Sequence, residues 1–251
     1  MVLELIDILQ GSFSLIFVLI SLYIGISILL KYFKYKSRLY ILVGISWIGV
    51  ANPWFPDSIS FVMNILFHES LAIEWYFIIG NAFIPIALLT WLIAYTDMRN
   101  KVRQKLIIIL TITISVIFEI VFFTLLITDI NQIGFINPLR PFTVEFSLFI
   151  TIYLLLVILV MFISGLLFAQ HSVKSGDRQI RLKGKLLRAA FITFTVAAIL
   201  DALLGTIFED PTDPLLAVMV VITRILLTIS AIEFYGGFIL PRWMQAIFTK
   251  K

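Results

Sequence analysis

Seven apolar stretches of about 20 residues each constrain this chain more than any other feature of its sequence. A helix of about that length crosses the roughly 30 Å hydrocarbon core of a bilayer. Lipid offers no partner to open backbone groups, so helix is forced even where Ile, Val and Phe are frequent. The predicted spans are about 11–30, 39–56, 71–96, 106–128, 143–169, 186–208 and 215–240. The first span starts either near 11 or inside the preceding segment 3–10.

The composition also indicates a membrane protein. Apolar residues make up 61% of the chain and charged residues 14%, with a mean hydropathy of +1.08. Soluble domains average about 45–50% apolar and about 25% charged residues, and disordered chains are less apolar still. We therefore predict an all-α membrane protein, a seven-helix bundle that forms one domain over residues 1–251.

Residues 57–68 are too short to cross a bilayer alone at about 1.5 Å per residue. They follow the break Asn52-Pro53-Trp54-Phe55-Pro56. They form either the outer half of a kinked second helix or a short helix at the interface. The next span starts from the same side in both cases, so the count stays at seven.

Basic residues predict the orientation. All lysines and arginines except Arg140 and Arg224 fall in 31–38, 99–105, 174–188 and 242–251, on one side of the predicted spans. The basic side of a membrane protein is cytoplasmic. We therefore expect a multi-pass protein of the plasma membrane with its N-terminus outside and its C-terminus in the cytoplasm.

The net charge of +4 is sorted by membrane side, so it does not indicate nucleic-acid binding. Topology and contact with anionic lipid heads explain the basic loops. A docking surface for a cytoplasmic signalling partner is the alternative interpretation.

Four charged residues lie inside the predicted spans, where such residues are functional candidates by default: Glu119, Asp201, Arg224 and Glu233. Helix rise places Glu119, Asp201 and Arg224 near one level. The short connection 209–214 makes the last two spans antiparallel neighbours, so Asp201–Arg224 is the best-placed ion pair. Glu119 joins it only if its span lines the same cavity, and Glu233 lies on the opposite face from Arg224.

Two interpretations of these residues stay open. A neutralised pair that fixes helix packing is one. A polar pocket for a small-molecule ligand, or a proton-sensitive switch, is the other.

The aromatic residues Trp54, Phe55, Trp75 and Tyr76 are predicted to lie in the interfacial belt near the outer boundary.

The residue inventory argues against an enzyme. The chain has no cysteine and two histidines, which excludes thiolate sites and disfavours a zinc hydrolase. We found no nucleophile motif of an intramembrane protease and no lysine in the last span to attach retinal. No catalytic residue, metal or cofactor is therefore expected.

The third span, 74–97, reads EWYFIIGNAFIPIALLTWLIAYTD. Its Tyr76/Phe77, Gly80, Pro85 and Tyr95-Thr96 resemble helix 3 of the seven-helix sensor region at the N-terminus of many histidine kinases. Asn81 and Pro85 also predict a kink here. Residues 241–251 alone follow the last span, so we expect no kinase domain. The segment RLKGKLLRAAF is similar to segments of archaeal seven-helix membrane proteins.

These patterns favour a non-enzymatic sensor or receptor-like signalling protein that acts through its basic cytoplasmic loops. Its expected partners are the lipid bilayer, a cytoplasmic signalling protein and a small-molecule ligand. The alternative is a transporter of a small solute or proton that uses the midplane polar residues. A lipid-modifying enzyme is a third class, for which the sequence supplies no nucleophile or metal site.

Overall fold

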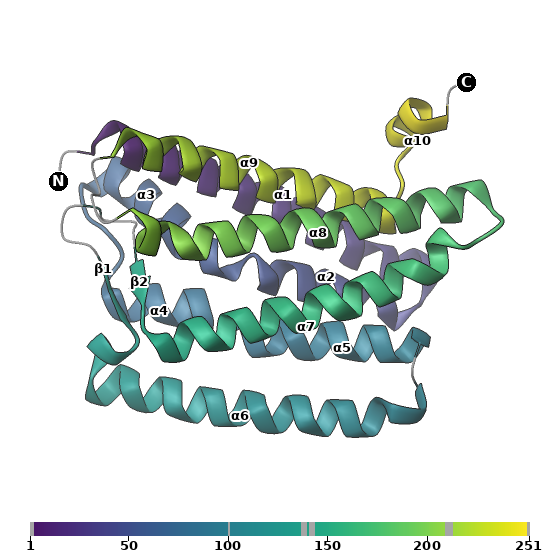
Figure 1. Cartoon of the computed structure of the whole chain (residues 1–251), viewed down its shortest axis with the longest axis horizontal. Helices are drawn as coiled ribbons and strands as arrows, with labels where there is room; N and C mark the ends of the chain where they lie inside the picture. Colours follow the sequence, from purple (N-terminus) through teal and green to yellow (C-terminus); the bar gives the residue numbers. More distant parts are fainter. Residues whose placement is uncertain (1–2, 100, 137–139, 141–143, 209–212, 250–251) are drawn as a thin grey trace.

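A computed structural model describes residues 3–99, 101–136, 140, 144–208 and 213–249 (Figure 1). Nearly all of this part of the chain is helical. The α-helices are α1 (Leu5–Tyr35), α2 (Arg38–Val50), α3 (Phe55–Phe67), α4 (Ile73–Asn81), α5 (Ile84–Arg99), α6 (Gln104–Thr128), α7 (Leu148–Val173), α8 (Arg178–Ile207), α9 (Pro214–Phe238) and α10 (Arg242–Thr249). The short elements are η1 (Asn52–Trp54), η2 (Lys101–Arg103), η3 (Ile130–Gln132), β1 (Gly134–Ile136) and β2 (Val144–Phe146).

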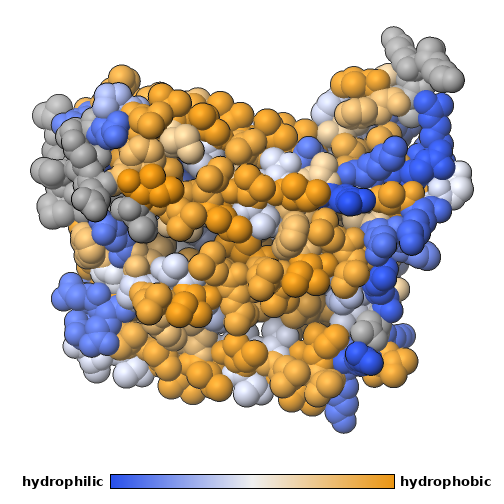
Figure 2. Space-filling view, viewed as in Figure 1, coloured by the Kyte–Doolittle hydropathy of each residue, from blue (hydrophilic) through white to orange (hydrophobic). Residues whose placement is uncertain are grey.

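The described residues contain seven helical segments long and apolar enough to cross a membrane, which confirms the predicted number. They are Leu5–Tyr35, Arg38–Phe67, Ile73–Arg99, Lys101–Thr128, Leu148–Val173, Arg178–Leu204 and Pro214–Phe238. Figure 2 shows apolar surface along the length of the bundle, with hydrophilic groups gathered at its two ends. Such a surface is consistent with a multi-pass membrane protein.

Polar residues cap two helices beyond the apolar stretch. α1 starts at Leu5, which confirms a start of the first span inside 3–10, and Glu4 with Asp7 forms a capping box there. α8 starts at Arg178 rather than 186, because the Asp177 carboxylate accepts the backbone N–H groups of Gln179 and Ile180.

The start of the fifth predicted span is also wrong. Residue 143 lies outside the described residues, and the chain just after it forms β2, which pairs antiparallel with β1. The helix α7 therefore begins only at Leu148. Apolar content alone does not separate a short strand from the first turn of a helix.

Two spans are broken helices. α2 passes through Ala51 and η1 directly into α3, so residues 57–67 continue the second span as its kinked second half. Pro53 and Pro56 each sit in a first turn, where a missing N–H is tolerated. The predicted kink in the third span is confirmed, since Ala82 and Phe83 separate α4 from α5.

Six spans close a ring in which α1 contacts α2 and α9, α2 contacts α5, and α7 contacts α5 and α8, which packs on α9. α6 lies at the edge of the bundle against α5 (Figure 1). Its Phe118 also stacks on Tyr153 of α7, with ring centroids 3.7 Å apart. Close approach of α2 to α5 requires Gly49, because a Cβ there would stand 2.6 Å from the Cβ of Ala87.

We call the end where α7 ends and α8 begins the basic end, and the end that holds β1 and β2 the hairpin end. The two ends lie at opposite sides of Figure 1.

Candidate functional site: a buried charge network

Arg224 of α9 lies at the centre of a polar cluster between helices. Its side chain is only 3% exposed. The guanidinium forms ion pairs with Asp201 of α8 and with Asp57 of α3, where Nη2 lies 3.3 Å from Oδ2. Its Nε donates a hydrogen bond of 2.8 Å to the Ser14 hydroxyl of α1. One planar group with five donors thus joins four helices.

The Asp201 carboxylate has further donors besides Arg224. The Trp54 indole N–H donates to its Oδ2 at 2.9 Å, and the Thr223 hydroxyl lies 3.4 Å from its Oδ1. Trp54 also presents its ring to Arg224, with the guanidinium carbon 6.0 Å from the ring centroid. The carboxylate is therefore held by α9 and by the turn between α2 and α3.

The Asp57 carboxylate is buried more deeply than that of Asp201. The Tyr76 hydroxyl of α4 donates to its Oδ1. Its Oδ2 lies 3.4 Å from the Ser14 hydroxyl and 3.5 Å from the Gln10 amide nitrogen, both on α1. The Asp57 carboxylate therefore meets donors from α1, α4 and α9.

A second guanidinium enters from the connection between β1 and β2. Arg140 is 2% exposed, its Nη2 donates to the Gln10 amide oxygen at 2.6 Å, and its Nε lies 3.6 Å from the Asp7 Oδ1. Burial lowers the pKa of Arg140, and the nearby Asp7 carboxylate opposes this shift. Arginine pKa values are so high that the group stays charged. Gln10 therefore links the two ion-pair clusters.

We call these side chains together the charge network. Its members are Asp7, Gln10, Ser14, Trp54, Asp57, Tyr76, Arg140, Asp201, Thr223 and Arg224. It contains three carboxylates and two guanidiniums, so its formal charge is negative when all are ionised.

The structure brings together Asp201 and Arg224, the pair that the sequence favours, but not the other two candidates. Glu119 is half-buried on α6, near Tyr153 of α7. Glu233 is half-buried on α9, within hydrogen-bonding reach of Thr193 on α8. Among the described residues, neither glutamate forms an ion pair.

Several network residues were missed by the sequence analysis. Asp57 and Arg140 were not among the four candidates, and both are buried. Trp54 and Tyr76, which were predicted for the interfacial belt, are buried and donate hydrogen bonds to carboxylates, whereas Trp75 is 59% exposed.

One signal was available in the first span. Asp7, Gln10, Ser14 and Ser21 recur at intervals of three, four and seven residues, which places them on one face of a helix. A polar stripe on an apolar helix indicates that this face meets other polar groups.

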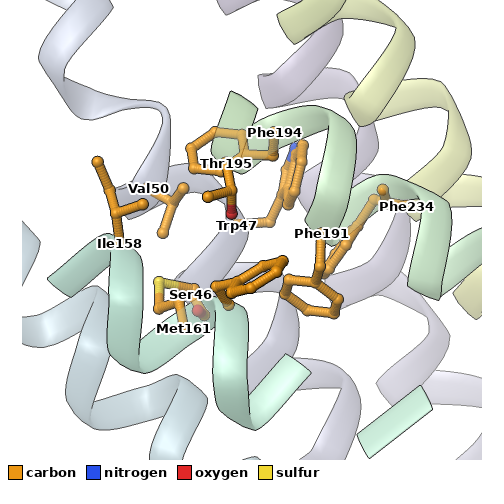
Figure 3. A pocket seen from close by; sticks show the side chains of 11 residues that line it. Ser46, Trp47, Val50, Ile158, Met161, Phe191, Phe194, Thr195 and Phe234 are labelled. Atoms are coloured by element: carbon orange, nitrogen blue, oxygen red, sulfur yellow. The ribbon is translucent and has the colours of Figure 1, made fainter. Parts of the chain in front are cut away.

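A separate pocket between α2, α7, α8 and α9 is lined mainly by apolar side chains. Figure 3 shows Ile158 and Val50 on one side of it and Trp47, Phe191 and Phe234 on the other. Its volume is about 10 Å³, which is room for about one water molecule. An organic ligand would therefore need these side chains to move.

In the described part of the chain, no group of three His, Asp or Glu side chains is placed to hold a metal ion.

Comparisons of this chain with family models, with curated proteins and with solved structures find no match. The resemblance to the sensor region of histidine kinases stays a prediction.

Proposed function

We propose that this chain is a receptor-like signalling protein of the plasma membrane, with its N-terminus outside and its C-terminus in the cytoplasm. The charge network receives the signal near the outer face, and the basic loops pass it to a cytoplasmic partner. The single observation behind this proposal is that Arg224 joins α1, α3, α8 and α9. A change in one ionic contact then alters the relative stability of several helix positions.

The geometry of α8 supports a path between the two faces. It carries Asp201 near the hairpin end and Arg178, Arg181, Lys185 and Arg188 near the basic end. A continuous helix of its 30 residues is about 45 Å long. A displacement of α8 at Asp201 would therefore also move the basic residues at the other end of the same helix.

The charge balance supports a proton or a cationic ligand as the signal. Three carboxylates face two guanidiniums, so adding one positive charge neutralises the charge network. A ligand can shift the protein only by its different affinity for two arrangements, and an uncompensated buried carboxylate provides that difference.

The test is hydrogen–deuterium exchange of residues 174–188 in the full chain, reconstituted in nanodiscs. Asp201→Asn should change exchange of this segment several-fold, because it removes one of the two carboxylates from Arg224. Glu119→Gln is the matched control, an intramembrane acid outside the charge network, and should leave exchange there unchanged. If Asp201→Asn lowers the melting temperature but leaves the exchange of residues 174–188 unchanged, the charge network is structural only.

A proton or small-solute transporter is the second candidate, favoured by the surplus of acids inside the spans. Glu119 and Glu233 add to the three carboxylates of the charge network. Proteoliposomes with a pH gradient separate the candidates. Proton flux that Asp201→Asn abolishes would favour the transporter, and a tight membrane together with altered exchange at 174–188 would favour the receptor.

A further inference from the structure

A cavity at the basic end lies outside the charge network. It has a volume of about 220 Å³ and is lined by Arg178, Arg181, Leu182 and Lys185 of α8 and by Phe248 of α10. We propose that this groove binds the phosphate head of an anionic phospholipid from the leaflet at the basic end.

The three cations of the groove share one face of α8. Arg178, Arg181 and Lys185 are separated by three and four residues, the spacing of neighbours on a helix surface. Guanidinium groups bind phosphate oxygens through paired hydrogen bonds. Asp177, the acid that precedes them, accepts hydrogen bonds from the backbone of Gln179 and Ile180. The groove therefore offers concentrated positive charge to a phosphate.

The helix that closes the groove is held at a fixed angle. Leu240 between α9 and α10 is buried and has a φ of 49°, a left-handed conformation that non-glycine residues rarely adopt. Met244 of α10 is buried with Leu240 and Leu186 in one apolar cluster. These contacts hold α10 where it projects sideways from the basic end (Figure 1).

The outer surface of α10 suits a membrane interface. Trp243, Ile247 and Phe248 are exposed, and Figure 2 shows apolar surface on this helix beside the hydrophilic groups of the basic end. Tryptophan concentrates at the boundary between lipid and water, and helices with such a face lie in that plane. A groove that combines three cations with Phe248 fits a lipid, which has both a phosphate and an apolar part, better than it fits a free anion.

The test uses the full chain in neutral detergent and counts bound lipids by native mass spectrometry. The probes are dioctanoyl phosphatidylglycerol and dioctanoyl phosphatidylcholine, which differ in net charge. The variant is Arg181→Gln with Lys185→Gln, and the matched control is Arg103→Gln with Lys105→Gln, two exposed cations at the same end but outside the groove.

The groove variant should bind phosphatidylglycerol roughly 30-fold more weakly than the parent chain, from the typical contribution of two cations near an anionic surface. The control should bind it as the parent does, and phosphatidylcholine should bind weakly to all three. The Phe248→Ser variant should also weaken lipid binding but not the binding of inorganic phosphate.

Equal losses in the groove variant and the control would overturn the proposal, because the effect would then be general surface charge. Displacement of the lipid by millimolar inorganic phosphate, with no effect of Phe248→Ser, would assign the groove to a free anion. A dimer that the groove variant dissociates, without bound lipid, would assign it to a second copy of the chain. Melting temperatures of all variants show whether each is folded.

Discussion

Asp201 of α8 and Glu119 of α6 look alike in the sequence, since each is a lone acid inside an apolar span. In the structure α8 packs between α7 and α9, and Asp201 meets Arg224, Trp54 and Thr223. α6 lies at the edge, and 22% of its apolar 18-residue stretch is buried, against 39% of the corresponding stretch of α8. An intramembrane acid is therefore compensated only where the neighbouring helices supply the partner.

The largest expected effect is that of Arg224→Met, which removes the guanidinium and leaves two buried carboxylates facing each other. Removing one partner of a buried ion pair costs about 3–5 kcal/mol. Reversible unfolding of the full chain by SDS in mixed micelles measures this loss. A loss below about 1 kcal/mol would mean that protonation or water replaces the guanidinium and that the two acids do not differ as the structure indicates.

The next largest effect is the recovery of stability when Asp201 is removed together with Arg224. In the variant Asp201→Ala with Arg224→Leu, Asp57 still lacks its guanidinium, so only part of the stability should return. Adding Asp57→Asn should return about 1–3 kcal/mol more, the typical cost of one unpaired buried polar or charged group. The same SDS titration measures the free energy of unfolding of Arg224→Met, of the double variant and of the triple variant. Complete recovery in the double variant would show that Asp57 does not depend on Arg224.

A smaller loss is expected from Asp7→Asn at the edge of the charge network. The Asp7 carboxylate lies 3.6 Å from Arg140, which keeps its shorter hydrogen bond to Gln10 in the variant. We expect a loss of about 1–2 kcal/mol. Glu74→Gln, an exposed acid on α4, is the matched control and should change stability by less than about 0.5 kcal/mol. Equal effects of the two variants would argue that the contact between Asp7 and Arg140 does not stabilise the protein.

The smallest effect is expected from Glu119→Gln. Among the described residues this carboxylate has no ion pair, so the variant should change the free energy of unfolding by no more than about 0.5 kcal/mol. The SDS titration used for Arg224→Met gives a direct comparison. A loss of about 2 kcal/mol or more would show that Glu119 has a cationic partner from outside the chain.

Much of the fold could be predicted because it depends on local sequence. A segment in lipid must satisfy its backbone internally, so each apolar stretch of sufficient length becomes a helix whatever surrounds it. Pro53, Pro56 and Pro85 mark the breaks in the second and third spans because proline removes a backbone donor. Capped polar ends such as Glu4 and Asp177 extended helices beyond the limits set by hydropathy.

The pair Asp201–Arg224 was also within reach of the sequence, because a short connection makes α8 and α9 neighbours and the helix rise sets the depth of each residue. Asp57 and Arg140 were not. Asp57 is 167 residues from Arg224, and Arg140 is 130 residues from Gln10. Depth and spacing state where each residue lies along its own helix, but not which helix stands opposite it. The sequence by itself determined the helices and one ion pair, whereas the ring order of the spans, which only the tertiary structure decides, made that pair the centre of a buried network.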